Sequence, residues 1–147
     1  MHWVRNSAPR WYVDLSLVIV AVLLALSVAK PVAWADTWEP DRFAKEDTLK
    51  LCTNVPDEGR YCFPVWLVVI DHQVYVRLGS RAADRFERST TKPVLGVQIA
   101  GQQFERVRGE AVPADAERVA QAMAAKYSSD VFVRWFSHPL TLRLVPE

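Results

Sequence analysis

Apolar and polar residues alternate, or apolar residues run together, in short segments along most of the chain, and turn-forming residues separate these segments. Alternation with a period of two is typical of strands that bury one face. The segments that predict strands are residues 49–54, 60–70, 74–78, 94–100, 103–112 and 140–145. We therefore expect a mainly β fold of about six antiparallel strands with peripheral helices.

Two turns predict which of these strands pair locally. Residues 56–59, Pro-Asp-Glu-Gly, combine a proline that fixes φ with a glycine that tolerates positive φ, so the flanking strands fold back on each other. Residues 71–73, Asp-His-Gln, join the next two strands in the same way. Pro64 cannot donate a hydrogen bond to a neighbouring strand, so it marks an edge or a bulge.

Cys52 and Cys62 lie symmetrically about Asp57, at the apex of the first predicted hairpin. In that register they face each other on adjacent strands, at a separation that a disulfide can span. A register shifted by one residue places them on opposite faces, and two buried thiols explain them equally well. Two cysteines without a CxxC spacing, together with three scattered histidines, give no zinc or haem signature.

Two further segments predict helices at the ends of a barrel. Residues 40–47 form a short helix, and the large apolar residues Trp38 and Phe43 are expected to plug one barrel end. Residues 113–127 place apolar side chains at helical spacing. We expect this longer helix to cover a barrel end as well.

A third helix, over residues 81–89, carries Arg81, Arg85 and Arg88 on one face. Acidic residues lie between these arginines, and surface ion pairs of small energy account for Arg85 and Arg88. Arg81 differs because it lies in the first turn of the helix, where backbone N–H groups are also free.

The segment that enters this helix is the candidate binding site. Arg77 lies at the end of a strand, and Gly79 and Ser80 connect it to Arg81. A guanidinium, a hydroxyl and the free N–H groups of a helix N-terminus are the parts of an anion site. The residues therefore predict a site for a negatively charged group.

The order of these features resembles a known family. The segment YVRLGSRAADRFERSTTKPVLGV, followed by GEAV and a final helix, resembles the split β-barrel proteins related to pyridoxamine-phosphate oxidase, including their flavin- or deazaflavin-dependent reductase branch. The resemblance covers the chain from Thr48 onward. It implies a split β-barrel that binds FMN or the deazaflavin F420 between the subunits of a homodimer. The apolar residues Phe132, Trp135 and Phe136 offer a dimer seam.

The resemblance also assigns roles to residues. The counterpart of YVRLGSR holds the cofactor phosphate, which assigns this role to Arg77, Ser80 and Arg81, in the turn that contains Gly79. Where the family often has a lysine that completes the phosphate clamp, this sequence has Asp84, whose charge would repel a phosphate.

Val65 and Trp66 would lie against or near the ring system of the cofactor by the same resemblance. The residue pattern alone favours Trp66 in the barrel core, since a tryptophan in an apolar strand usually packs.

The first 35 residues have the layout of a secretory signal. Arg5 and Arg10 precede an unbroken run of apolar or small residues at 15–29, and Ala33-Trp34-Ala35 provides a cleavage site of the A-x-A type. An uncleaved membrane anchor formed by residues 11–35 is the alternative, although the central run is shorter than the ~20 residues that span a bilayer. In both cases the remainder of the chain is exported.

Two parts are therefore expected: a signal peptide or membrane anchor at residues 1–35 and an FMN-binding-like split barrel at residues 36–147. The formal net charge is +1, and removal of the first part leaves −1. Neither value indicates a nucleic-acid partner or a membrane-binding surface beyond the N-terminal segment.

Three functions are consistent with the sequence. No Gly-x-Ser-x-Gly motif occurs, so a cofactor must supply the chemistry if the protein is an enzyme. The functions are an exported flavin- or deazaflavin-binding oxidoreductase, a degenerate split barrel that binds a small ligand or nothing, and a structural or interaction protein of the envelope. Gln98, Glu105 and Arg106 either present polar groups to a substrate or form solvated strand faces.

Overall fold

The computed structural model describes residues 37–127 and 138–147. By its contacts the chain divides into two units, Met1–Ala35 and Asp36–Glu147. The predicted signal or anchor at residues 1–35 and the seam residues Phe132, Trp135 and Phe136 lie outside the described residues. In the part that is described, no helix has the length and apolar character needed to cross a membrane.

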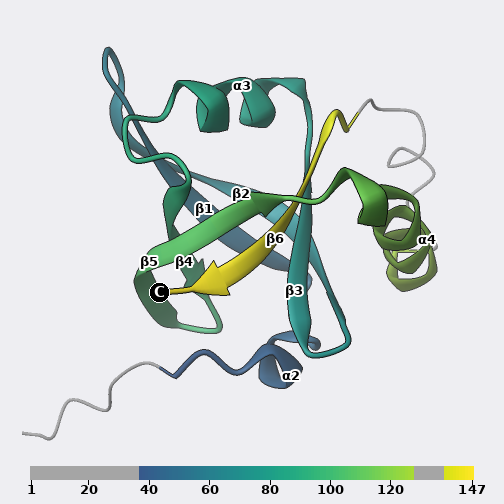
Figure 1. The fold of residues 1–147 in the computed structure, drawn as a ribbon. Helices are drawn as coiled ribbons and strands as arrows, with labels where there is room; N and C mark the ends of the chain where they lie inside the picture. Colours follow the sequence, from purple (N-terminus) through teal and green to yellow (C-terminus); the bar gives the residue numbers. More distant parts are fainter. Residues whose placement is uncertain (1–36, 128–137) are drawn as a thin grey trace, which may run out of the picture. The chain divides into compact units, whose positions relative to one another are not determined.

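The described residues form six antiparallel strands, as the alternating pattern predicted, and these close into a barrel, as the family resemblance implied (Figure 1). Around the barrel the order is β1-β2-β3-β6-β5-β4, and β1 pairs with β4 to complete the ring. The strands are β1 (Thr48–Val55), β2 (Gly59–Ile70), β3 (Gln73–Leu78), β4 (Val94–Ile99), β5 (Gln102–Ala111) and β6 (Leu140–Pro146).

The β1–β2 hairpin has the register that the cysteine spacing suggested. Cys52 is directly opposite Cys62, and a disulfide joins them. Cys52 also lies opposite Gly96 of β4. It follows Leu51, whose side chain is in the interior cluster, so the disulfide is on the outer face of the barrel. Gly59 has a φ of +66°, which the turn between β1 and β2 requires and which glycine adopts at little cost.

Alternate residues of each strand fill the barrel interior. Leu49 and Leu51 of β1 are 2% and 1% exposed, and most inward residues of the other strands are also buried. The interior cluster also contains Leu67, Val74, Val76, Leu78, Leu95, Val97, Ile99, Val107, Leu142 and Leu144. Burial of this apolar surface is the main source of the stability of the barrel.

Two short helices lie at opposite ends of the barrel (Figure 1). At one end lies α2 (Pro40–Phe43), which is shorter than the predicted 40–47. Phe43 is fully buried, and its ring, Trp38 and Phe104 of β5 form edge-to-face contacts with centroids 5.0–6.1 Å apart. The prediction that Trp38 and Phe43 plug a barrel end is confirmed.

At the other end lies α3 (Ser80–Arg88), anchored by Phe86, which is 3% exposed. The tip of the β1–β2 hairpin holds the outer side of this helix, because Glu58 forms ion pairs with both Arg85 and Arg88. The backbone N–H of Thr90 donates to the carbonyl of Asn54 at 2.8 Å. The first hairpin therefore fixes the position of α3.

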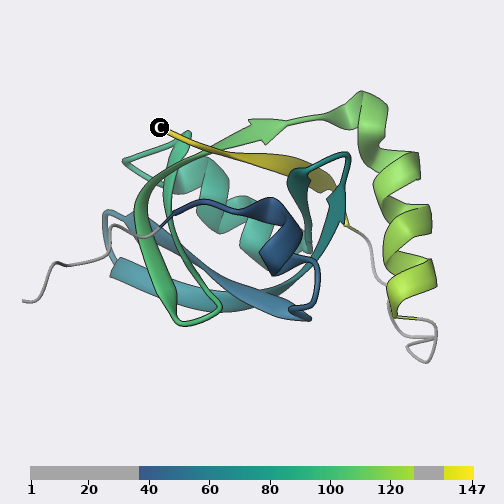
Figure 2. The ribbon, with the colours of Figure 1, turned by 90° about the horizontal axis from the view of Figure 1, so that it is seen from below.

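The longest helix of the described residues, α4 (Ala116–Lys126), does not cover a barrel end, so this prediction was wrong. It follows the short 3-10 turn η2 (Pro113–Asp115) and lies beside the barrel wall (Figure 2). Val119 and Met123 pack against Val68 and Tyr75, which project outward from β2 and β3. Residues 66–70 are apolar on both faces of the strand, so the outer face also needs a covering element.

Candidate functional site

A hollow of about 350 Å³ lies between the start of α3, the strands β2 and β3, and α4. We call it the Arg77 hollow. Its wall is mostly apolar and aromatic, with one arginine and one histidine, which is the composition usual for small-molecule sites. The lining residues are Thr48, Phe63, Pro64, Val65, Trp66, Arg77, Gly79, Ala82, Met123 and His138.

Arg77 supplies the positive charge of this hollow. It lies on the outward face of β3, two residues after the buried Tyr75, and its side chain is half-buried. Its Nε is buried without a hydrogen-bond partner. Burial lowers the pKa of the Arg77 guanidinium, and the negative charge of Glu117 partly opposes this effect. A buried donor without a partner indicates room for a ligand or water that accepts from it.

Arg77 and Arg81 differ from the other arginines of the described residues, because no carboxylate lies within ion-pair distance of either side chain. Every other arginine in residues 37–127 and 138–147 has such a partner. These arginines are Arg42, Arg60, Arg85, Arg88, Arg106, Arg108, Arg118 and Arg143. The two arginines that the sequence selected as anion ligands are thus the two whose charge is not neutralised locally.

The structure brings together four of the six residues assigned to cofactor binding. Val65, Trp66, Arg77 and Gly79 all line the Arg77 hollow. Gly79 is the N-cap of α3, and no side chain caps the helix there, so the first backbone N–H groups are free of a side-chain acceptor.

Ser80 and Arg81 are exposed in the first turn of α3 and are not among the lining residues. They lie at the same helix end as Gly79, and a ligand that extends beyond the hollow toward this end would reach them first. Their assignment to cofactor binding therefore stays a prediction.

Trp66 is not in the barrel core, where the residue pattern alone had favoured it. It is half-buried on the outer face of β2, and its ring stacks on that of Tyr127 with centroids 5.3 Å apart and planes at 21°. The side chain lies outward because Val65, its neighbour, is the residue that packs against the interior cluster.

Tyr127, just after α4, also forms hydrogen bonds to the barrel backbone. Its hydroxyl lies 2.7 Å from the carbonyl oxygen of Leu67 and 2.6 Å from that of Asp47. Lys126 donates to the carbonyls of Glu46 and Leu67. Burial raises the pKa of the Tyr127 hydroxyl to about 12, from an ordinary value of 10.0.

The raised pKa of Tyr127 predicts a loss of stability in base. The folded chain holds the phenol proton more tightly than the unfolded chain, so this contribution is complete below pH 10 and is lost as the pH rises towards about 12. Between about pH 9 and about pH 11, the free energy of unfolding in urea should fall more for the wild type than for Tyr127→Phe. Other titrating groups are common to both proteins, and equal falls would contradict the prediction.

Asp84 was expected to repel a phosphate. It is exposed, accepts a hydrogen bond from Nε of Arg88 at 3.1 Å, and does not line the Arg77 hollow. Its charge is therefore partly balanced, and its side chain belongs to the ion-pair group on the outer side of α3.

Sequence reasoning missed several residues of the hollow: Thr48, Phe63, Ala82, Met123 and His138 line it as well. Phe63 carried a local signal, since it shares a strand face with Val65. Met123, Tyr127 and His138 come from segments more than 40 positions after Arg77 and Gly79, and no local pattern could have placed them at the hollow.

The fold and the hollow together define a small split β-barrel with an arginine-containing site on its outer wall. Neither a protein-family model nor a curated protein sequence matches the chain. Among solved structures, it is similar to HutZ, the heme storage protein from Vibrio cholerae, with a TM-score of 0.55 and 19% identity over 73% of this chain and 87% of that one.

A second similar structure, described as a domain-swapped dimer, has a TM-score of 0.52 and 10% identity over 91% of this chain and 98% of its own. An F420-H2 dependent reductase, FDR-A, aligns with a TM-score of 0.49 and 10% identity over 67% of this chain and 94% of that one. At these identities the likeness is one of fold. The chain has the split-barrel fold that its sequence resemblance indicated.

Proposed function

We propose that the protein is an exported or membrane-anchored, flavin- or deazaflavin-binding protein of the oxidoreductase type, which holds FMN or F420 in the Arg77 hollow. The observation that carries this proposal is the half-buried guanidinium of Arg77, without a carboxylate partner among the described residues and with a buried, unbonded Nε, at the wall of an apolar hollow. Both cofactors have a planar ring, which an apolar wall can bury, and an attached phosphate, which the guanidinium of Arg77 can bind.

Each part of the chain has a definite role in this proposal. Arg77 binds the phosphate or another anionic group, and the free N–H groups at Gly79 and the first turn of α3 favour negative charge at the same place. Val65, Trp66 and Met123 exclude water from the ring. Bound there, a flavin or deazaflavin would supply hydride transfer, while the protein supplies orientation and electrostatics.

Export and assembly are further parts of the proposal. The basic, apolar and A-x-A segments of residues 1–35 support export by cleavage or anchoring. A homodimer is supported by the fold-level likeness to a structure described as a domain-swapped dimer. A dimer would also cover the ring of Tyr61, which is 49% exposed.

Haem binding is the second candidate, and the composition of the same hollow favours it. Met123 and His138 line the hollow, and both residue types ligate haem iron in proteins. The similar structure HutZ is a heme storage protein. The negatively charged propionates of a haem would also find a partner in Arg77.

Titration of the full chain with FMN, F420 and haemin, followed by visible absorbance, tests the proposal. We expect FMN or F420 to bind, and Arg77→Ala to weaken binding by about tenfold to a hundredfold, the usual effect of removing a hydrogen-bonded charge. Arg106→Ala is the matched control, since Arg106 is exposed, pairs with Glu147 and lies outside the hollow.

The outcomes separate the candidates. Haemin binding with a Soret band and no response to FMN or F420 would favour the haem alternative. No binding of any of the three would overturn both cofactor proposals and leave a non-catalytic split barrel that binds another small ligand or acts as an interaction protein of the envelope.

A further inference from the structure

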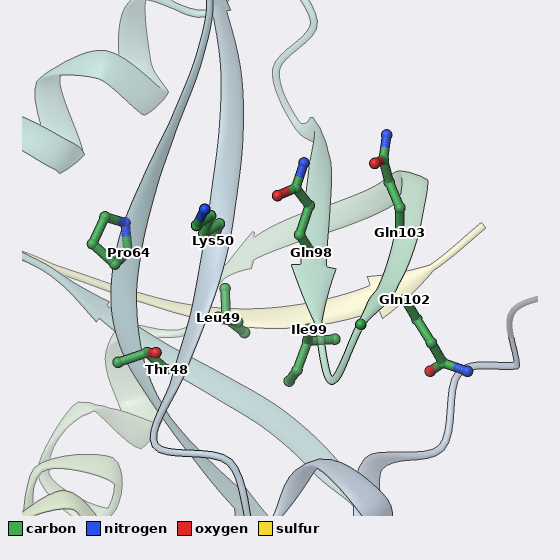
Figure 3. Close-up of a pocket in the computed structure, with 9 residues that line it drawn as sticks. Thr48, Leu49, Lys50, Pro64, Gln98, Ile99, Gln102 and Gln103 are labelled. Carbon is green, nitrogen blue, oxygen red and sulfur yellow. The ribbon is translucent and has the colours of Figure 1, made fainter.

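A second hollow, of about 380 Å³, lies on the barrel wall where β1, β4 and β5 run side by side (Figure 3). We call it the Lys50 hollow. Its polar wall is a row across three strands: Lys50 of β1 lies opposite Gln98 of β4, and Gln98 lies opposite Gln103 of β5. Opposed residues on adjacent strands share a face and are close enough to contact one ligand.

The direction of these side chains agrees with the register. Figure 3 shows the amides of Gln98 and Gln103 extending the same way, with Lys50 beside them, whereas Gln102 extends to the opposite side. Neighbouring strands are about 4.8 Å apart, so the row spans about 10 Å. That length suits a small molecule with several polar groups.

Lys50 is the only charged residue among those that line this hollow. In the described part of the chain, no carboxylate lies within ion-pair distance of its ammonium group. The hollow therefore has a single positive charge followed by two carboxamides. An ammonium group binds a carboxylate, and a carboxamide both donates and accepts, as a hydroxyl group does.

Two other polar residues of these strands lie beside the row. Glu105 forms a bidentate ion pair with Arg60, at 2.8 and 3.1 Å, and accepts a hydrogen bond from the side-chain amide of Gln103. Arg106 pairs with Glu147. Both line a different hollow, beside Cys52. Of the three residues that the sequence offered as substrate contacts, Gln98 alone lies in the Lys50 hollow.

The Lys50 hollow adjoins the Arg77 hollow. Thr48 and Pro64 line both, and Pro64 lies opposite Lys50 in the β1–β2 register. Pro64 also precedes Val65 and Trp66, the residues of the Arg77 hollow that would face a cofactor ring. A molecule held at Lys50 is therefore next to whatever occupies the Arg77 hollow.

We propose that the Lys50 hollow binds a small polyhydroxylated carboxylate of the sugar-acid class. Its carboxylate pairs with Lys50, and its hydroxyl groups exchange hydrogen bonds with the amide of Gln98, next to the Gln103 amide that Glu105 holds. Because the two hollows adjoin, this molecule is the substrate of the bound cofactor; that role, unlike the binding itself, rests on the proposed function.

Gluconate, sorbitol and hexanoate are the probes, because sorbitol lacks the carboxylate and hexanoate lacks the hydroxyl groups. In NMR titrations of the full 15N-labelled chain, gluconate should shift the side-chain amide signals of Gln98 and Gln103 and bind about tenfold more tightly than either comparison compound. Lys50→Gln should weaken gluconate about tenfold, whereas Lys45→Gln, at an exposed lysine outside the hollow, should not. Equal affinities for gluconate and sorbitol, or no effect of Lys50→Gln, would overturn the proposal.

The same samples separate this proposal from the proposed function. If FMN or F420 binds and gluconate does not, the sugar-acid site is wrong and the cofactor proposal stands. If gluconate binds through Lys50 but no cofactor binds, the substrate role is wrong. Binding of both, with gluconate altering the visible spectrum of the bound cofactor, would support the adjoining arrangement.

Discussion

Replacing Phe86 by alanine is expected to lower the free energy of unfolding by about 3–5 kcal/mol, the usual cost of removing a buried aromatic ring. Phe86 is 3% exposed and is the large apolar anchor of α3 in the interior cluster. A Cβ added at Gly109 would lie 3.1 Å from its ring, so β5 approaches the ring closely. The vacated space cannot be filled without moving either the helix or the strand. Urea denaturation measures the loss.

Tyr61→Ala is the control for this experiment. Tyr61 is also aromatic and contacts α3, through a guanidinium of Arg85 that lies 4.3 Å from its ring centroid, but it is 49% exposed. We expect a loss below about 1.5 kcal/mol. Losses of similar size in the two variants would contradict the account of Phe86 as the anchor of α3.

Reduction of the Cys52–Cys62 disulfide is expected to lower the free energy of unfolding by about 3 kcal/mol. The two cysteines are 10 positions apart, and a crosslink that closes a loop of this size limits the unfolded chain by roughly that amount. Urea denaturation with and without a reductant gives the difference. The disulfide also joins the two strands of the hairpin whose tip contacts α3 through the ion pairs of Glu58. Because the start of α3 borders the Arg77 hollow, reduction should also weaken ligand binding there.

The double variant Cys52→Ala, Cys62→Ala is the matched control. It should have the stability of the reduced wild type, and a reductant should not change it. A wild type that is equally stable in both redox states would show that the crosslink does not limit the unfolded chain as expected.

The strands were predictable because their signals are local. Alternation within residues 49–54 and 94–100 marks the inward face, and the turns at 56–59 and 71–73 fix two hairpins. The same local argument offered a Cys52–Cys62 disulfide but left two buried thiols as an equal alternative, and the structure has the disulfide. Only the family resemblance predicted that the strands close into a ring, because the pairs β1–β4 and β3–β6 join segments that are distant along the chain.

The site was predictable in part for the same reason. Arg77 and Gly79 are recognisable from a strand end followed by a helix start, and they do line the hollow. The position of Trp66 was ambiguous, because residues 66–70 are apolar throughout and the strand pattern does not show which face is inside. The stacking of Trp66 on Tyr127 depends on where α4 packs, and this tertiary packing cannot be derived from the local sequence.

The ion-pair pattern could not be predicted from sequence. Acidic residues beside Arg85 and Arg88 suggested partners within the helix, and Asp84 does pair with Arg88. Glu58, in the hairpin tip about 30 positions earlier, pairs with both arginines, and no local pattern indicated it. Such ion pairs neutralise most arginines of the described residues, whereas Arg77 has no carboxylate partner among them. The charge available to a ligand is therefore a property of the folded surface.

The position of β6 in the ring has a consequence for the order of assembly. Leu140–Pro146 fills the gap between β3 and β5, although it is the last strand along the chain. Until these residues have left the ribosome, β3 and β5 offer unpaired backbone groups on which another chain could add. A chain cut short before Leu140 would keep those two open edges permanently and would be prone to aggregate.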